Sequence, residues 1–110
     1  MTAKTLEQYS VLVKKAIGKP GILSNLQVEA SADFARYSEM FAEYEIKRAK
    51  FIDVLSSEGK SIASCEHRWL TEEDGQKWVY LKFYLRGLKQ MTKAIESATY
   101  VANAEANNKI

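Results

Sequence analysis

The sequence contains little of what would break or cross-link a helical fold. It has one cysteine, Cys65, which excludes an intrachain disulfide and makes a reducing compartment the simplest expectation. One proline and five glycines leave few points at which a helix has to stop. No apolar run approaches the ~18 residues of a membrane span, and the N-terminal stretch MTAKTLEQYS lacks the apolar core of a signal peptide. A soluble, cytoplasmic protein is expected.

Neither the charge nor the composition is extreme. The net charge of +2 is too small to indicate a polyanionic partner, which only a local cluster of cations could do. Apolar residues make up 46% and charged residues 27% of the chain, as in ordinary globular proteins. A length of 110 residues corresponds to one domain. Residues 1–110 are therefore expected to form a single helical domain with a polar tail that frays from about residue 103.

Apolar periodicity predicts an all-α fold. Thr5 can cap a first helix, and Thr71, which opens the segment TEED, can cap a last one. Residues 18–24 contain the only proline and are predicted to form a linker or turn. The expected architecture is a hairpin-like bundle of two long helices, with a short N-terminal helix and a short connecting helix. The four helical segments are residues 6–17, 25–57, 62–70 and 72–104.

The two long helices carry wide apolar faces. Aromatic and aliphatic residues of the first recur at steps of three and four from Phe34 to Leu55, as in a heptad seam, with Arg48 as the one interruption. A cation on an apolar seam needs a partner, a route to solvent or a groove. The last helix has two adjacent apolar lines, wider than one neighbouring helix covers, which predicts a homo-oligomer. The candidate interface residues are Trp78, Leu81, Leu85, Leu88, Met91 and Ile95.

Residue patterns that support catalysis or metal binding are missing. The segment EGKS at 58–61 has Val54 where a phosphate-binding loop needs glycine, so a helix-ending turn is the better interpretation. Cys65 and His67 are the only cysteine and histidine, and they cannot complete a four-ligand zinc site. We expect Cys65 to pack as an apolar group and His67 to be partly exposed. No pair of acids suggests acid–base chemistry, so a non-enzymatic protein without a cofactor is predicted.

Cations are grouped in two places. Between Gly75 and Ile95 there are five basic residues and no acidic one, interleaved with Tyr80, Phe83 and Tyr84. Cations beside aromatic rings are typical of sites for single-stranded nucleic acid, in which cations follow the phosphates and rings stack on bases. Rings at helical spacing are more often core, so Tyr80 and Tyr84 are expected in the core, whereas Phe83 is left open; the alternative for the cations is a solvated helix face. The candidate nucleic-acid contacts are Lys47, Arg48, Lys50 and Lys60 in the first cluster and Lys82, Arg86, Lys89 and Lys93 in the second.

The order of these features resembles a known family. A long helix ends in a basic-Ala-basic triplet, Arg48-Ala49-Lys50, and runs into a glycine turn. The last helix then carries a tryptophan, spaced leucines and a Gly-Leu pair: Trp78, Leu81, Leu85 and Gly87-Leu88. Over residues 26–100 this resembles the UvsY-type recombination mediator proteins of T-even-like phages. The resemblance implies a helical protein that forms rings, binds single-stranded DNA and helps to load the phage recombinase onto strands covered by single-strand-binding protein.

The resemblance also implies roles for particular residues. Arg48 and Lys50 would contact DNA, Lys47 would extend the triplet, and Lys60 lies near the family's basic residue after the turn. The last helix would be the assembly element, in an infected bacterial cytoplasm. The chain departs from the family in its extra basic row at 82–93, which leaves open which cluster contacts DNA. A phage structural or assembly factor, or a helical protein-interaction module without nucleic acid, is the alternative. Convergence of the cations at 47–50 and 82–93 on one surface of the assembled form would discriminate between the two, and scattered positions would favour the alternative.

Overall fold

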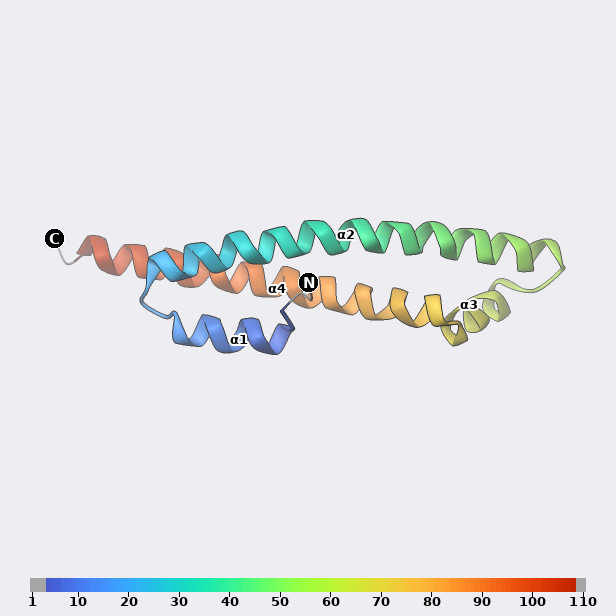
Figure 1. The fold of residues 1–110 in the computed structure, drawn as a ribbon, viewed down its shortest axis with the longest axis horizontal. Helices are drawn as coiled ribbons and strands as arrows, with labels where there is room; N and C mark the ends of the chain where they lie inside the picture. Colours follow the sequence, from blue (N-terminus) through green and yellow to red (C-terminus); the bar gives the residue numbers. More distant parts are fainter. Residues whose placement is uncertain (1–3, 109–110) are drawn as a thin grey trace. The chain divides into compact units, whose positions relative to one another are not determined.

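The regular structure of the chain is entirely helical. The computed structural model describes residues 4–108, apart from the side chains of residues 106 and 108 (Figure 1). Within that range there is no strand, which confirms the predicted all-α class, and no helix is long and apolar enough to cross a membrane. The helices are α1 (Leu6–Lys15), α2 (Pro20–Ser57), α3 (Ile62–Thr71) and α4 (Glu73–Asn108).

The start of α1 agrees with the sequence, whereas the connection to α2 is shorter than predicted. Thr5 and Gln8 form a capping box at the start of α1, as the position of Thr5 indicates. The connection turns at Gly18, whose φ of 80° is accessible mainly to glycine. Helix α2 begins directly at Pro20, so the predicted linker over 18–24 is wrong in length. Proline suits the first position of a helix because its missing N–H would have no partner there.

The turn between α2 and α3 is a helix-ending motif, as predicted for EGKS. The Lys60 N–H donates to the Leu55 carbonyl at 3.1 Å and the Gly59 N–H to the Ser56 carbonyl at 3.0 Å. With Gly59 at a φ of 85°, these bonds form a Schellman motif. The backbone donors of the segment therefore point back into α2. Ser61 then caps α3 by accepting from the Ser64 N–H.

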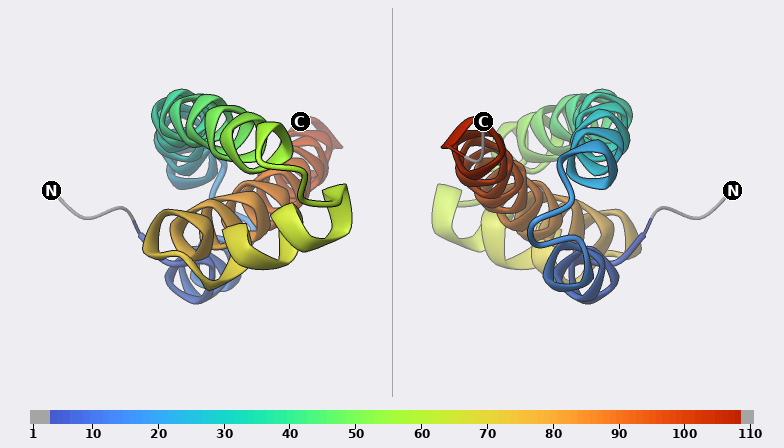
Figure 2. Two further views of the ribbon diagram at one scale, coloured as in Figure 1. Left: turned by 90° about the vertical axis from the view of Figure 1, so that its right-hand side faces the viewer. Right: turned by 90° about the vertical axis from the view of Figure 1, so that its left-hand side faces the viewer.

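The boundary between α3 and α4 lies one residue later than predicted, and α4 extends further. Thr71 belongs to α3, where its hydroxyl donates to the Arg68 carbonyl at 2.7 Å, so its predicted capping role is wrong. Glu72 is extended, and its carbonyl accepts the first helical bond of α4, from Gln76, at 3.0 Å. The chain thus changes direction at Glu72, which places α3 beside the first turns of α4 (Figure 2). Helix α4 continues past residue 103 to Asn108.

The chain divides into two compact units, and both long helices contribute to each. We call them the terminal unit (residues up to Ala35 and from Arg86 onward) and the central unit (Arg36–Leu85). In the terminal unit α1 packs on α2 and α4. The hydroxyl of buried Tyr9 donates to Asp33 of α2 at 2.5 Å. The buried side chains of this unit are Tyr9, Ala16, Leu23, Leu26, Ala30, Leu88, Ile95 and Ala102.

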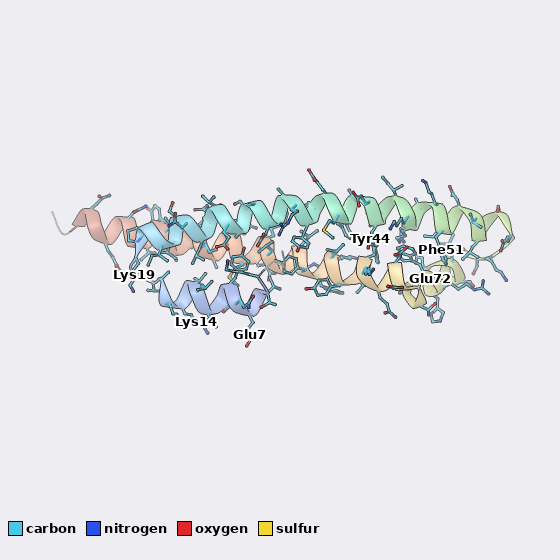
Figure 3. The ribbon with its side chains drawn as sticks, in the orientation of Figure 1. Glu7, Lys14, Lys19, Tyr44, Phe51 and Glu72 are labelled. Carbon is cyan, nitrogen blue, oxygen red and sulfur yellow. The ribbon has the colours of Figure 1, made fainter. Side chains whose placement is uncertain are left out.

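Aromatic rings from three helices form the core of the central unit. The seam predicted on α2 contacts α3 and α4, and Figure 3 shows Tyr44 and Phe51 on the side of α2 that faces them. Such ring pairs contribute about 0.5–1.5 kcal/mol each beyond the area that they bury. The pairs are Tyr37 with Tyr84, Phe41 with Trp78, and Phe51 with Trp69, with centroids 5.3, 6.1 and 5.5 Å apart.

Tyr80 and Tyr84 differ in burial, although both were expected in the core. Tyr84 is buried, whereas Tyr80 is 62% exposed, so the prediction is wrong for Tyr80. The two rings are one helical turn apart and stack with centroids 6.1 Å apart. The neighbouring helices of the central unit cover Tyr84 and leave Tyr80 in solvent, because the apolar surface of α4 is wider than they can bury.

Candidate nucleic-acid interface

Arg48, the one cation on the apolar seam of α2, forms an ion pair within the same chain. Its Nη2 donates to Glu66 Oε1 of α3 at 2.9 Å, and its guanidinium carbon lies 5.2 Å from the centre of the Trp78 ring. The Arg48 side chain is 27% exposed and that of Glu66 is 52% exposed. The carboxylate and the ring face together explain how a cation is accommodated on an apolar seam. A pair this exposed stabilises the fold by about 0–1 kcal/mol.

Lys82 of α4 approaches the same ring. Its Nζ lies 5.1 Å from the centre of the Trp78 ring. The Trp78 Nε1–H donates to Glu45, and its ring stacks on Phe41 with an interplanar angle of 18°. These contacts fix the orientation of the indole ring. Arg48 from α2 and Lys82 from α4 therefore lie against one fixed aromatic surface. The first and second basic clusters therefore meet at Arg48 and Lys82.

A pocket of about 440 Å³ opens at this meeting point. All three helices of the central unit contribute to its wall. Trp69 is buried, and its Nε1–H has no hydrogen-bond acceptor among the residues that the structure describes. Phe83, by contrast, is 57% exposed. The pocket thus combines two cations, one carboxylate and aromatic surface. Its lining includes Arg48, Glu66, Trp69, Trp78, Lys82 and Phe83.

The other members of the first cluster do not line this pocket. Lys47 is exposed, and its Nζ lies 4.7 Å from the centre of the Tyr44 ring. Lys50 is exposed and lies two residues beyond Arg48, which puts it on the far side of α2. Lys60 is exposed in the turn before α3. The predicted triplet is therefore not one surface, since its residues point in different directions from a regular helix.

The rest of the second cluster belongs to the terminal unit. Arg86, Lys89 and Lys93 are exposed on α4. Lys89 and Lys93 line a separate pocket of about 290 Å³, which also includes Phe34 and Glu96. Glu96 in addition accepts a hydrogen bond from the Gln27 amide at 3.2 Å. This second pocket also combines two cations with one acid and one ring, but it lies in the other unit.

Half of the residues predicted for a subunit interface are buried within the single chain. Leu81, Leu88 and Ile95 are buried in this single chain, whereas Trp78, Leu85 and Met91 are half-buried. All of them except Met91 belong to one apolar line of α4, which the other helices of the chain cover in large part. These side chains stabilise the fold of the chain itself. The second apolar line of α4 includes two exposed side chains, Tyr80 and Val101. This line consists of Tyr80, Tyr84, Gly87, Met91, Ala94, Ala98 and Val101.

The sequence did not reveal four residues of the pocket, Glu66, Trp69, Leu70 and Val79. Glu66 follows Arg48 by 18 residues and a turn, a separation that carries no helical signal. Trp69 carries no charge and belongs to a short helix whose orientation depends on the Glu72 corner. The neighbouring predictions are confirmed, because Cys65 is buried and His67 is exposed. The described residues include no group of three or more histidine, cysteine or acidic side chains that could hold a metal ion.

Comparison with known proteins adds nothing to this geometry. No protein-family model, curated protein or solved structure matches the chain. What the pocket binds has to be inferred from its own residues.

Proposed function

We propose that this chain is a non-enzymatic accessory protein of phage homologous recombination that binds single-stranded DNA and helps to load a recombinase. The observation that carries the DNA-binding part is the approach of Arg48 and Lys82, from the two basic clusters, to one Trp78 ring. Phosphates need cations, and an unpaired strand also offers bases to aromatic rings. The pocket beside Trp78 supplies both within the central unit.

The role in recombination rests on the resemblance to UvsY-type mediators. In this proposal the two long helices form a hairpin-like bundle, and several chains assemble into a ring in the cytoplasm of an infected bacterium. The exposed apolar residues on the second line of α4, such as Val101, would supply the contacts between chains. A ring repeats each DNA contact and so raises the avidity of individually weak sites. Its protein partners would be the recombinase and the single-strand-binding protein.

Replacing Lys82 by alanine should weaken binding to single-stranded DNA several-fold at low salt. The exposed Lys82 ammonium would release one counterion on meeting a phosphate, so its loss should reduce the slope of log K against log salt by about 0.7 per site. The measurement is the fluorescence anisotropy of a labelled oligonucleotide, titrated at several salt concentrations. Lys77→Ala is the matched control, because this lysine is also on α4 and pairs with Glu73 at 3.5 Å. An unchanged slope for Lys82→Ala would contradict the role of Lys82.

Replacing Glu66 by glutamine should change DNA binding in the opposite direction. The substitution removes the negative charge 2.9 Å from Arg48 and leaves the shape of the side chain almost unchanged. Arg48 then no longer has to give up an ion pair when it contacts a phosphate, so the affinity should increase. The same anisotropy titration measures this. Weaker binding by Glu66→Gln would show that the carboxylate orients Arg48 instead of competing for it.

A protein-interaction module without nucleic acid is the second candidate. Apolar side chains are exposed on all three helices of the central unit, and they include Ile46, Ile62 and Leu70. Exposed apolar side chains would contact a protein partner if they form one continuous surface. The absence of oligonucleotide binding at low salt would favour this candidate and contradict the proposed function.

A further inference from the structure

Phe34 differs from the later rings on the apolar seam of α2. Each of those rings contacts a second ring or a cation, namely Tyr37, Phe41, Tyr44 and Phe51. Among the residues that the structure describes, Phe34 has no such contact with a ring or a cation. Its half-buried side chain instead lines the pocket of the terminal unit. Phe34 is therefore the ring of the seam whose surface a ligand in a pocket can contact without displacing another ring or a cation.

Two cations line the same pocket without an acid to neutralise them. Lys89 and Lys93 are four residues apart on α4, so they lie on one face of the helix, where like charges repel each other. No acidic side chain that the structure describes forms an ion pair with either lysine. An anionic group between the two ammonium groups would offset their repulsion. The pocket of the terminal unit thus combines an uncovered ring with two uncompensated positive charges.

Glu96, the acid that lines this pocket, has a different partner. Its Oε1 accepts a hydrogen bond from the side-chain amide of Gln27 at 3.2 Å. An ionised carboxylate only accepts hydrogen bonds, so it repels a phosphate but can accept from the N–H groups on the pairing edge of a base. The pocket therefore suits a ligand with one anionic part and one flat part that carries N–H donors. A free phosphate would match the two lysines alone.

We propose that this pocket holds one nucleotide of a single DNA strand, with its base stacked on the ring of Phe34 and its phosphate between Lys89 and Lys93. The inference rests on the proposed function and adds a strand-binding site in the terminal unit to the one in the central unit. The volume of about 290 Å³ is near the lower end of the range for small-molecule sites, ~300–1,000 Å³, which suits a single base. The identity of the base matters little, since every base has a face on which a ring can stack.

The inference predicts a preference for single strands over duplex DNA. A base in a duplex would have to leave its stack and its pairing partner before it could lie on Phe34. Lys89 and Lys93 would contact the phosphates of single and double strands alike. The ring is thus the part of this pocket that distinguishes the two forms.

The test compares a labelled oligothymidylate with an abasic deoxyribose-phosphate strand of the same length and charge. Fluorescence anisotropy gives the affinity of the wild-type protein and of Phe34→Leu for each strand. Leucine keeps the site apolar but removes the flat face of the ring. We expect Phe34→Leu to bind the oligothymidylate at least about 5-fold more weakly than the wild-type protein does, and the abasic strand with unchanged affinity.

Two further variants assign this effect to the ring of Phe34. Phe34→Tyr keeps an aromatic face and should bind both strands as the wild-type protein does. Tyr100→Leu is the matched control, since Tyr100 is an exposed ring of the terminal unit outside the lining of this pocket, and its loss should change neither affinity. Circular dichroism should show unchanged helix content in all three variants.

The lysines are tested on the same two strands. Replacing Lys89 and Lys93 together by alanine should reduce the slope of log K against log salt by about 0.7 per site on both strands, because one phosphate contact is lost. Lys14→Ala is the matched control, since Lys14 is an exposed cation of the terminal unit that does not line the pocket. Both lysines of the pocket are exposed on α4, so their replacement should leave the fold intact.

Each other outcome overturns a defined part of the inference. If Phe34→Leu loses the same factor on both strands, or loses nothing, the base does not stack on Phe34. An unchanged salt slope for the double lysine variant would overturn the phosphate contact. In both cases weaker binding by Lys82→Ala would leave the proposed function standing. Binding of neither strand by the wild-type protein would overturn the proposed function and this inference with it.

Discussion

Gly75→Ala is expected to destabilise the chain by about 3 kcal/mol or more, although alanine is the better helix former. A Cβ at Gly75 would lie 1.6 Å from the carbonyl oxygen of Trp69 and 2.6 Å from its carbonyl carbon. These are backbone atoms of α3, so no rotation of a side chain can relieve the overlap. The corner between α3 and α4 would have to open. The measurement is the free energy of unfolding from urea titration followed by circular dichroism.

The matched control for this substitution is Gly21→Ala. Gly21 is also near the start of a long helix, and a Cβ there would meet nothing within 4 Å. Its replacement should stabilise the chain by up to about 1 kcal/mol, because alanine loses less backbone entropy than glycine on forming a helix. Equal stability of Gly75→Ala and the wild-type protein would contradict the close approach of α4 to Trp69. The Gly75 variant should also lose DNA affinity, because Trp69 lines the pocket.

Leu88→Ala is expected to lower the free energy of unfolding by about 2–5 kcal/mol. Leu88 is completely buried in the terminal unit, so truncation removes its apolar contacts and leaves a cavity. The same urea titration measures the loss. Light scattering on the folded variant should show an unchanged mass, since Leu88 is covered by the chain itself. A variant with native stability but a smaller mass would instead place Leu88 between subunits.

Val101→Ala is the comparison for Leu88→Ala. Val101 is on the same helix and in the same unit but is 53% exposed. Its truncation should change the unfolding free energy by no more than about 0.5 kcal/mol. In the proposed ring it should lower the mass measured by light scattering. The two variants thus separate the line of α4 that forms the core from the line that remains for a partner.

The sequence alone determined the four helices, and it predicted the start of α1, the end of α2 and the start of α3 to the residue. The heptad spacing of rings on α2, the capping Thr5 and the turn at Gly59 are local signals, which act through neighbours within a few residues. For the same reason the burial of Cys65 and the exposure of His67 could be predicted. The errors at the ends also have local causes. Pro20 was predicted to lie in the segment between the first two helices, but it is the first residue of α2, and the hydroxyl of Thr71 bonds backward to α3.

Only the tertiary structure decided which residues make the site. Arg48 and Lys82 are 34 positions apart, and their common contact with Trp78 depends on how α2 and α4 meet in the central unit. Glu66 reaches Arg48 because α3 turns back at Gly59. Packing within the terminal unit buries Leu88, and packing within the central unit leaves Tyr80 and Phe83 exposed. The sequence shows that α4 has two apolar lines. Which side chains on them are buried depends on where the few other helices of the chain pack.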